Sequence, residues 1–269
     1  MEIIKAHAVN NLCYIEAKKM VPRGIVVHST GANNPMLKRY VDCPDKLGTN
    51  IYNNHWNTAK PGGKKVCVHA FIGYDKNKKV RVAEILPLDI CCWGVGSGRK
   101  GSYNYEPPHI QFEICEDSRQ DKEYYQQAFG VAAEYCAYLC KRFGLTVEQI
   151  VGHNEAHAKG YGSNHSDPEH WMKKFGETMD DFRRKVATLL SSTSPVKQTT
   201  DATSPYLVKV TTNALNIRKG PGTNTTKVGC IRDRGVYTIV EEKTGKGASL
   251  WGKLKSGAGW ISLDYVKKL

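Results

Sequence analysis

The sequence has no run of roughly 18 apolar residues, and this absence excludes a membrane-spanning helix. Its first residues, MEIIKAHAVNNL, also lack the basic segment and apolar core of a secretory signal. We therefore expect a protein that is made in the cytoplasm without a signal peptide and is not inserted in a membrane. Apolar residues make up 40% and charged residues 24%, which is typical of a soluble globular protein.

The sequence also lacks a CxxC pair and any repeated Cys/His spacing of the zinc-finger kind. Its nine cysteines are an odd number and cannot all pair, and 269 residues suffice to build a core without disulfides. Several cysteines occupy core positions, such as Cys67 and Cys115 in apolar runs. We interpret most of them as reduced, buried, small side chains.

Acidic residues are scarce relative to basic ones, with 26 Asp and Glu against 39 Lys and Arg, a net charge of +13. Residues 206–269 contain 12 basic and 4 acidic residues, so most of the excess lies in the last quarter of the chain. A polyanionic partner is indicated: nucleic acid, anionic lipid or a bacterial wall polymer.

The chain divides at a segment rich in Ser, Thr and Pro, SSTSPVKQTTDATSP, which has no hydrophobic period. We predict a first domain over 1–190, a linker over 191–205 and a second domain over 206–269. The second domain consists of short strand-like runs between Gly-rich turns, which predicts a small β-barrel and a binding module.

The first domain alternates strand and helix signals, which predicts an α/β fold with a central sheet flanked by helices. Strands are expected over 24–28, 66–73, 79–86 and 110–115. A helix is expected between Asp121 and Phe143, with Gly144 ending it. A second helix is expected to begin at Asp167 and Pro168 and to continue as far as Val186.

Histidines are concentrated in one segment, GHNEAHAKGYGSNHSDPEHW, which spans 152–171. A further histidine, His28, ends the apolar run GIVVH, where a strand end would hold it rigidly beside a loop-lined cleft. A lone histidine at a strand end is more often structural, but four within 20 residues favour a metal site. Zinc takes three or four N, O or S ligands, and a catalytic zinc leaves one position for water.

Glu113 lies inside the strand-like run IQFEIC, between Phe112 and Ile114. A carboxylate among apolar neighbours is costly unless it is paired or used chemically. Beside a zinc-bound water it would act as a general base. The alternative is that Glu113 points to the solvent face of an alternating strand. The residues alone favour neither interpretation.

Together these residues resemble the zinc-dependent N-acetylmuramoyl-L-alanine amidases of the type 2 class, which are related to peptidoglycan recognition proteins and phage endolysins. The resemblance covers roughly residues 20–190. The order and spacing of five motifs support it: IVVHSTG (25–31), VHAFIG (68–73), ICCWGVGSG (90–98), HIQFEIC (109–115) and VGHNEAH…NHSDPEHW (151–171).

The resemblance implies a mixed β-sheet fold and a zinc ion held by His28, His153 and Asp167. It also implies that Glu113 is the catalytic base that takes a proton from the attacking water. The expected reaction is hydrolysis of the amide between N-acetylmuramic acid and L-alanine in peptidoglycan.

Further roles follow from the same resemblance. His165 stands where the family often has a lysine that stabilises the oxyanion, and His157 or His165 could compete as a metal ligand. Gly94 follows the motif tryptophan, where the family usually has histidine. Substrate contacts are implied at His69, Trp93 and Asn164.

The last 64 residues resemble a bacterial SH3-like (SH3b) cell-wall-binding domain through LNIRKGPGTNTTKVG (215–229) and GWISLDYV (259–266). Their positive charge suits anionic wall polymers such as teichoic acid. Trp251, Trp260 and Tyr265 are candidate wall contacts, although the two tryptophans are better explained as barrel core. A catalytic domain, a linker and a wall-binding module without a signal peptide resemble a phage endolysin, which reaches the wall once the membrane is opened.

Two other functions deserve comparison with the amidase. A non-catalytic recognition protein could hold a muropeptide in the same groove, but such proteins typically lack a zinc ligand, and every ligand position is filled here. A nucleic-acid-binding protein would explain the charge. The chain lacks a basic helix and aromatics interleaved with Lys and Arg, so we expect no nucleic-acid partner.

Overall fold

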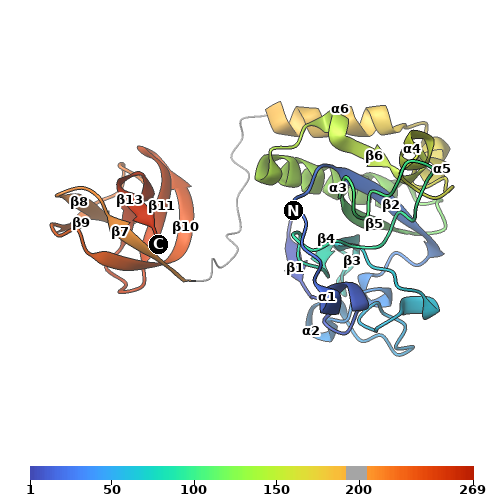
Figure 1. The fold of residues 1–269 in the computed structure, drawn as a ribbon, viewed down its shortest axis with the longest axis horizontal. Helices are drawn as coiled ribbons and strands as arrows, with labels where there is room; N and C mark the ends of the chain where they lie inside the picture. The colour runs from blue at the N-terminus through green and yellow to red at the C-terminus, as the bar shows by residue number, and fades with distance from the viewer. Residues whose placement is uncertain (192–204) are drawn as a thin grey trace. The chain divides into compact units, whose positions relative to one another are not determined.

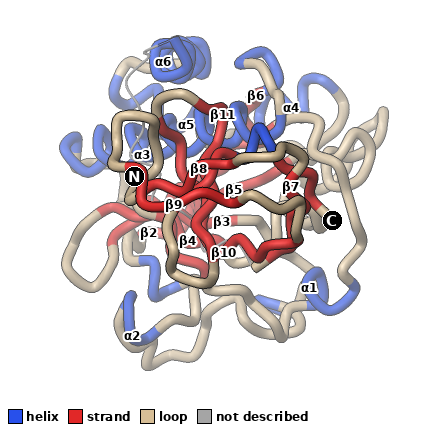
Figure 2. The backbone as a smooth tube through the Cα atoms, turned by 90° about the vertical axis from the view of Figure 1, so that its left-hand side faces the viewer, coloured by secondary structure: helices blue, strands red, loops and turns tan. Residues whose placement is uncertain are grey.

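The computed structural model describes residues 1–191 and 205–269, which form two compact units (Figure 1). The linker predicted at 191–205 falls almost entirely on residues 192–204, outside the described residues. Within the described ranges, no helix is long and apolar enough to cross a membrane. The helices α1–α6, blue in Figure 2, all belong to the first unit.

The first unit is built on a six-stranded mixed sheet with the strand order β1-β4-β3-β5-β2-β6. Strands β3, β5, β2 and β6 run parallel to one another, and β4 is antiparallel to β3. The strands are β1 (Ile3–Lys5), β2 (Ile25–Asn33), β3 (Ala70–Tyr74), β4 (Val80–Glu84), β5 (Ile110–Glu116) and β6 (Ile150–Gly152). The predicted α/β class, with a mixed central sheet flanked by helices, is confirmed.

The α-helices of this unit differ greatly in length, from four residues to 22. They are α1 (Leu12–Glu16), α2 (Pro44–Leu47), α3 (Lys122–Phe143), α4 (His153–Lys159), α5 (Glu169–Met172) and α6 (Met179–Ser191). Short 3-10 helices are η1 (Leu37–Arg39), η2 (Pro61–Gly63), η3 (Val147–Gln149), η4 (Lys173–Phe175) and, in the second unit, η5 (Leu263–Tyr265).

Helix α3 has the ends that the sequence predicts. The Asp121 side chain accepts hydrogen bonds from the backbone N–H groups of Glu123 and Tyr124, and Gly144 ends the helix in the left-handed conformation. With α6, α3 covers one face of the sheet (Figure 1). The buried side chains of β5 on that face, such as Phe112, pack against α3 residues such as Tyr135.

The single helix predicted from Asp167 onward is wrong. The chain forms α5 and then η4, and this helical segment ends at Gly176, which has a φ of 72°. Helix α6 then begins anew, with Thr178 and Asp181 bonded to each other's backbone N–H. The Asp167 carboxylate caps no helix because it lies against two histidines. The strand predicted over 66–73 also starts later, at Ala70.

The opposite face of the sheet packs against α1, α2 and long loops, and part of it packs against α4 (Figure 1). Of the nine cysteines, seven are buried, and their thiols serve as small core side chains as predicted. This face also contains buried polar side chains, among them His28, His69, Gln111 and His153. The functional residues discussed below lie on this side.

The second unit is all β, with seven strands in the order β13-β7-β10-β11-β12-β8-β9. The strands are β7 (Tyr206–Val210), β8 (Leu215–Arg218), β9 (Lys227–Ile231), β10 (Val236–Gly245), β11 (Ala248–Leu254), β12 (Trp260–Ser262) and β13 (Val266–Lys268). Trp251 and Trp260 are buried, as their interpretation as core residues predicts, whereas Tyr265 is 52% exposed.

Candidate metal centre and active site

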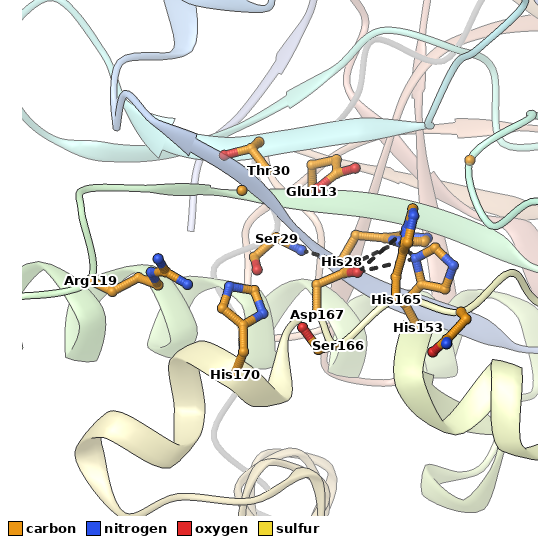
Figure 3. A pocket seen from close by; sticks show the side chains of 13 residues that line it. His28, Ser29, Thr30, Glu113, Arg119, His153, His165, Ser166, Asp167 and His170 are labelled. Atoms are coloured by element: carbon orange, nitrogen blue, oxygen red, sulfur yellow. Dashed lines mark hydrogen bonds and ion pairs between the residues drawn. The ribbon is translucent and has the colours of Figure 1, made fainter.

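Three side chains from three segments meet at one end of the parallel strands. His28 lies on β2, His153 is the first residue of α4 directly after β6, and Asp167 lies in the loop before α5. Because β2 and β6 pair in parallel, with Val27 opposite Gly152, the residues that follow them, His28 and His153, lie side by side. Figure 3 shows their rings and the Asp167 carboxylate converging.

We call these three side chains the triangle, because their possible metal-binding atoms all lie within 4.8 Å of one another. The Nδ1 atoms of His28 and His153 are 3.1 Å apart, and the Asp167 carboxylate oxygens lie 3.2 Å from the first and 3.3 Å from the second. Ligand bonds of about 2.0–2.1 Å in a tetrahedral zinc site place ligand atoms about 3.3 Å apart. The separations of these atoms therefore suit three ligands of one tetrahedral zinc ion.

Hydrogen bonds on the far side of each ring fix which nitrogen is free. His28 Nε2 donates to Gln111 Oε1 at 3.1 Å. His153 Nε2 donates to Ser163 Oγ at 3.2 Å, and that hydroxyl donates to the Val95 carbonyl. In the tautomer that makes these bonds, Nε2 carries the proton and the Nδ1 lone pair of each ring points toward the other histidine. A bound cation would satisfy both lone pairs, and this support behind the ligands is typical of metal sites.

Gly94 makes room for the support behind His28. A Cβ at position 94 would lie 2.6 Å from Gln111 Oε1 and 2.9 Å from the Val68 side chain. The Gly94 N–H donates to Asn104 Oδ1, which also accepts from Gln111 Nε2 at 2.9 Å. Gly94 therefore belongs to the arrangement that orients His28.

The protonation states of the triangle suit a metal. Burial alone would raise the pKa of Asp167, but the adjacent imidazoles of His153 and His28 outweigh it and hold that pKa well below its usual range. Burial lowers the pKa of His153. At neutral pH the site thus offers an ionised carboxylate and an uncharged imidazole, the forms that bind metal ions.

Glu113 lies beside this triangle. It is opposite His28 in the parallel pairing of β2 and β5, and it lines the same cavity (Figure 3). Its Oε2 is buried and has no hydrogen-bond partner. Burial raises its pKa well above the ordinary value, and the nearby Asp167 and Glu116 raise it further. The structure places Glu113 at the cavity beside the triangle, and its role as a general base stays a prediction.

The cavity has a volume of about 680 Å³. The residues that line it are His28, Ser29, Thr30, Gly31, Gly94, Glu113, Arg119, His153, Asn164, His165, Ser166, Asp167 and His170. Arg119 and His170 lie at the opposite end from His153 and His165 (Figure 3). A cleft with convergent polar groups and a perturbed carboxyl is a strong candidate for an active site.

His165 stands at the mouth of the site, with its side chain 62% exposed and Nδ1 3.9 Å from Asp167 Oδ1. Its ring meets the His153 ring edge-on at 4.5 Å. Burial and the neighbouring His153 lower its pKa, so its ring is uncharged at neutral pH. His165 can therefore offer an N–H to a substrate oxygen as a neutral donor.

Two residues predicted to contact substrate lie elsewhere. His69 is fully buried: Nε2 donates to the Ile90 carbonyl, and Nδ1 accepts from the Gln111 N–H. Burial lowers its pKa to about 4. Trp93 packs edge-on against Tyr105 and lines a separate cavity of about 220 Å³. Of the three predicted contacts, the structure brings only Asn164 to the large cavity.

His157 lies away from the triangle. Its Nδ1 donates to the Gly162 carbonyl at 3.2 Å, and the group of side chains able to hold a metal consists of His28, His153 and Asp167. This is the one such group found among the described residues.

Sequence reasoning missed several residues of the site. Gln111 stands two positions before Glu113 on β5, so strand alternation could have placed both side chains on one face. Arg119 has no comparable signal because it lies in the loop between β5 and α3. His170 belongs to the histidine-rich segment 152–171, but the sequence assigned it no role of its own.

Comparisons with known proteins bear on the same residues. The model of the family Amidase_2, N-acetylmuramoyl-L-alanine amidase, matches residues 18–170, a range that contains the triangle and Glu113. No curated protein matches the chain.

Three solved structures are among those to which the chain is similar. Staphylococcus aureus AmiA, solved with its ligand, is 20% identical over 71% of this chain and 83% of its own, with a TM-score of 0.46. The PlyG catalytic domain is 22% identical over 73% and 100%, with a TM-score of 0.49. A mutant endolysin from Bacillus subtilis is 19% identical over 69% and 99%, with a TM-score of 0.46. The family model matches more than half of the residues of this chain, which therefore belongs to the N-acetylmuramoyl-L-alanine amidase family.

Proposed function

We propose that the first unit is a zinc-dependent amidase that cleaves the amide between the lactyl group of N-acetylmuramic acid and L-alanine in peptidoglycan. The observation that carries this proposal is the triangle of His28, His153 and Asp167 with Glu113 beside it in one cavity. Two imidazoles, one carboxylate and an open fourth position form the donor set expected of catalytic zinc.

His28, His153 and Asp167 would hold the zinc ion. When bound, zinc supplies a Lewis acid that polarises the scissile carbonyl and lowers the pKa of water. Glu113 takes the proton of the attacking water and delivers it to the leaving amine of L-alanine. A pKa raised toward the working pH lets one carboxyl first accept a proton and then donate it.

His165 donates an N–H to the oxygen that becomes negative as water adds to the carbonyl. Its place at the cavity mouth, beside His153, supports this role. Such donors are worth about 3–4 kcal/mol of barrier lowering where single ones have been removed. The guanidinium of Arg119 at the other end suits the carboxylates of a peptidoglycan stem peptide.

The second unit, over 206–269, is proposed to be an SH3-like module that binds the bacterial wall, joined to the catalytic domain (1–190) by the linker 191–205. Its 12 basic against 4 acidic residues suit anionic wall polymers. Such a module raises the local concentration of enzyme at its substrate. This organisation supports an endolysin that acts on the wall after the membrane is opened, or a cellular autolysin with the same chemistry.

A non-catalytic recognition protein is the second candidate. Digestion of purified peptidoglycan, with and without a chelator, separates the two. The amidase should release new alanine amino termini without new reducing sugar ends, lose this activity with the chelator and regain it with zinc. Wall binding without any product would favour the recognition protein, and new reducing ends would indicate a glycosidase.

The targeting role has its own test. A chain that ends at residue 191 should digest soluble muropeptide as the full chain does but sediment less with purified walls. Equal sedimentation of the two chains would contradict a wall-binding role for the second unit.

A further inference from the structure

Glu116, the last residue of β5, is buried and accepts three hydrogen bonds at one oxygen. Its Oε1 accepts from the Ser29 hydroxyl at 2.7 Å and from the Gly31 N–H at 3.1 Å. The same oxygen accepts from His170 Nε2 at 2.9 Å. Three donors to one carboxylate oxygen, from two distant parts of the chain, indicate a defined structural task.

These donors follow the proposed metal ligands along the chain. Ser29 and Gly31 come directly after His28 on β2, and His170 lies three residues after Asp167. Neither segment is held by regular structure alone. The pairing of β2 with β5 shifts register between Ser29 and Asn33, and Asp167 lies outside any helix or strand. Glu116 therefore joins the two segments.

The charges of Glu116 and His170 strengthen the hydrogen bond between them. Burial alone would raise the pKa of Glu116, but the hydrogen bonds from His170 and Ser29 lower it. The hydrogen bond that His170 donates to Glu116 raises the pKa of His170 despite its partial burial. Hydrogen bonds to charged groups are shorter and stronger than neutral ones.

Glu116 itself does not line the cavity, although Ser29, Gly31 and His170 do. Its second oxygen faces Arg119 Nε at 3.4 Å. It therefore has no access to a substrate or to reacting atoms, and any influence on the reaction acts through its partners.

We propose that Glu116, through His170, is a positioning residue that holds the Asp167 segment against the end of β2, so that the metal-binding triangle is formed before the ion arrives. This inference rests on the proposed metal site. Residues that orient metal ligands from behind typically contribute about 10- to 100-fold to metal affinity.

Zinc affinity of the full-length protein tests this role, measured by competition with a chromophoric chelator. Glu116→Ala and His170→Ala should each weaken zinc binding by about 10- to 100-fold. The double variant should bind no more weakly than Glu116→Ala because both substitutions break the same link. If the two losses of zinc affinity multiply in the double variant, the two residues do not act through the same hydrogen bond, which would contradict the proposal.

Glu84→Ala is the matched control. Glu84 is also a buried carboxylate of the sheet and accepts a hydrogen bond from Tyr135 on the α3 side. It should lose thermal stability and keep wild-type zinc affinity. Equal loss of zinc affinity in this control would show a general effect of destabilisation and overturn the proposal.

The remaining outcomes are distinct. If Glu116→Ala does not fold, His170→Ala decides, because it leaves the bonds from Ser29 and Gly31 in place. Folded variants that bind zinc as tightly as the wild type overturn the positioning role and leave the proposed function standing. A wild-type protein that binds no zinc would instead contradict the proposed function itself.

Discussion

Alternate residues of β5 face two very different environments on the two sides of one sheet. Ile110, Phe112 and Ile114 are fully buried in the core formed with α3 and α6. Gln111 and Glu113 point to the other side, where Gln111 supports His28 and Glu113 lines the cavity. One face supplies rigid packing, and the other places polar groups at fixed positions on that rigid base. Substitutions of neighbouring residues should therefore have separable effects.

The largest expected effect is that of Glu113→Gln on turnover. It should lower kcat by about 10²- to 10⁴-fold, the usual contribution of general acid–base catalysis. Zinc content and folding should be retained because the amide fills the same space. Peptidoglycan digestion followed by amino-terminal analysis measures kcat, and Glu84→Gln serves as a control that should keep it. Undiminished turnover would remove Glu113 from the mechanism.

Phe112→Ala tests the packing face. The ring is fully buried and meets Tyr135 edge-on at 5.5 Å. Its removal should lower the free energy of unfolding by about 3–5 kcal/mol, measured by urea denaturation. The folded fraction should keep its zinc affinity. A loss of zinc binding in the folded protein at low temperature would show that the two faces are not separable.

Gln111→Ala tests the support behind His28. Without the amide oxygen, His28 Nε2 loses its acceptor, so the ring is less firmly oriented. Zinc affinity should fall by about 10- to 100-fold, with a smaller loss of stability than for Phe112→Ala. Chelator competition measures the affinity. A variant with unchanged affinity would mean that packing alone orients His28.

The smallest effect concerns pH. Because its pKa is raised, Glu113 in the folded, metal-free protein binds its proton more tightly than in the unfolded chain. The free energy of unfolding should therefore fall as pH rises from the ordinary glutamate pKa of about 4.3 through the raised value. Glu113→Gln should lack this component in denaturation series recorded with a chelator. Identical pH slopes in the two proteins would contradict it.

Much of this arrangement could be predicted from the sequence, and particular residues show which parts could not. Alternation and capping signals predicted β5 and α3 because they are local properties of the chain. The ligands His28, His153 and Asp167 followed from a family resemblance, and whether they bind metal stays a prediction. His69 shows the limit. Its motif implied substrate contact, but only tertiary packing decides that its ring is enclosed between Ile90 and Gln111.

Loop geometry accounts for other omissions. Gly176 interrupts the hydrophobic period of the predicted helix, but that period continues beyond it and suggested a single element. Glu116 and His170 are 54 residues apart in the sequence, so no local pattern could join them. Contacts of this kind become visible only once the fold is known.

The metal site is best tested by the zinc content of purified protein, counted per chain for the wild type, Glu113→Gln and His28→Ala. We expect one zinc ion in the wild type and in Glu113→Gln and a strongly reduced content in His28→Ala, because His28 belongs to the triangle. Undiminished zinc in His28→Ala would contradict the metal centre described above.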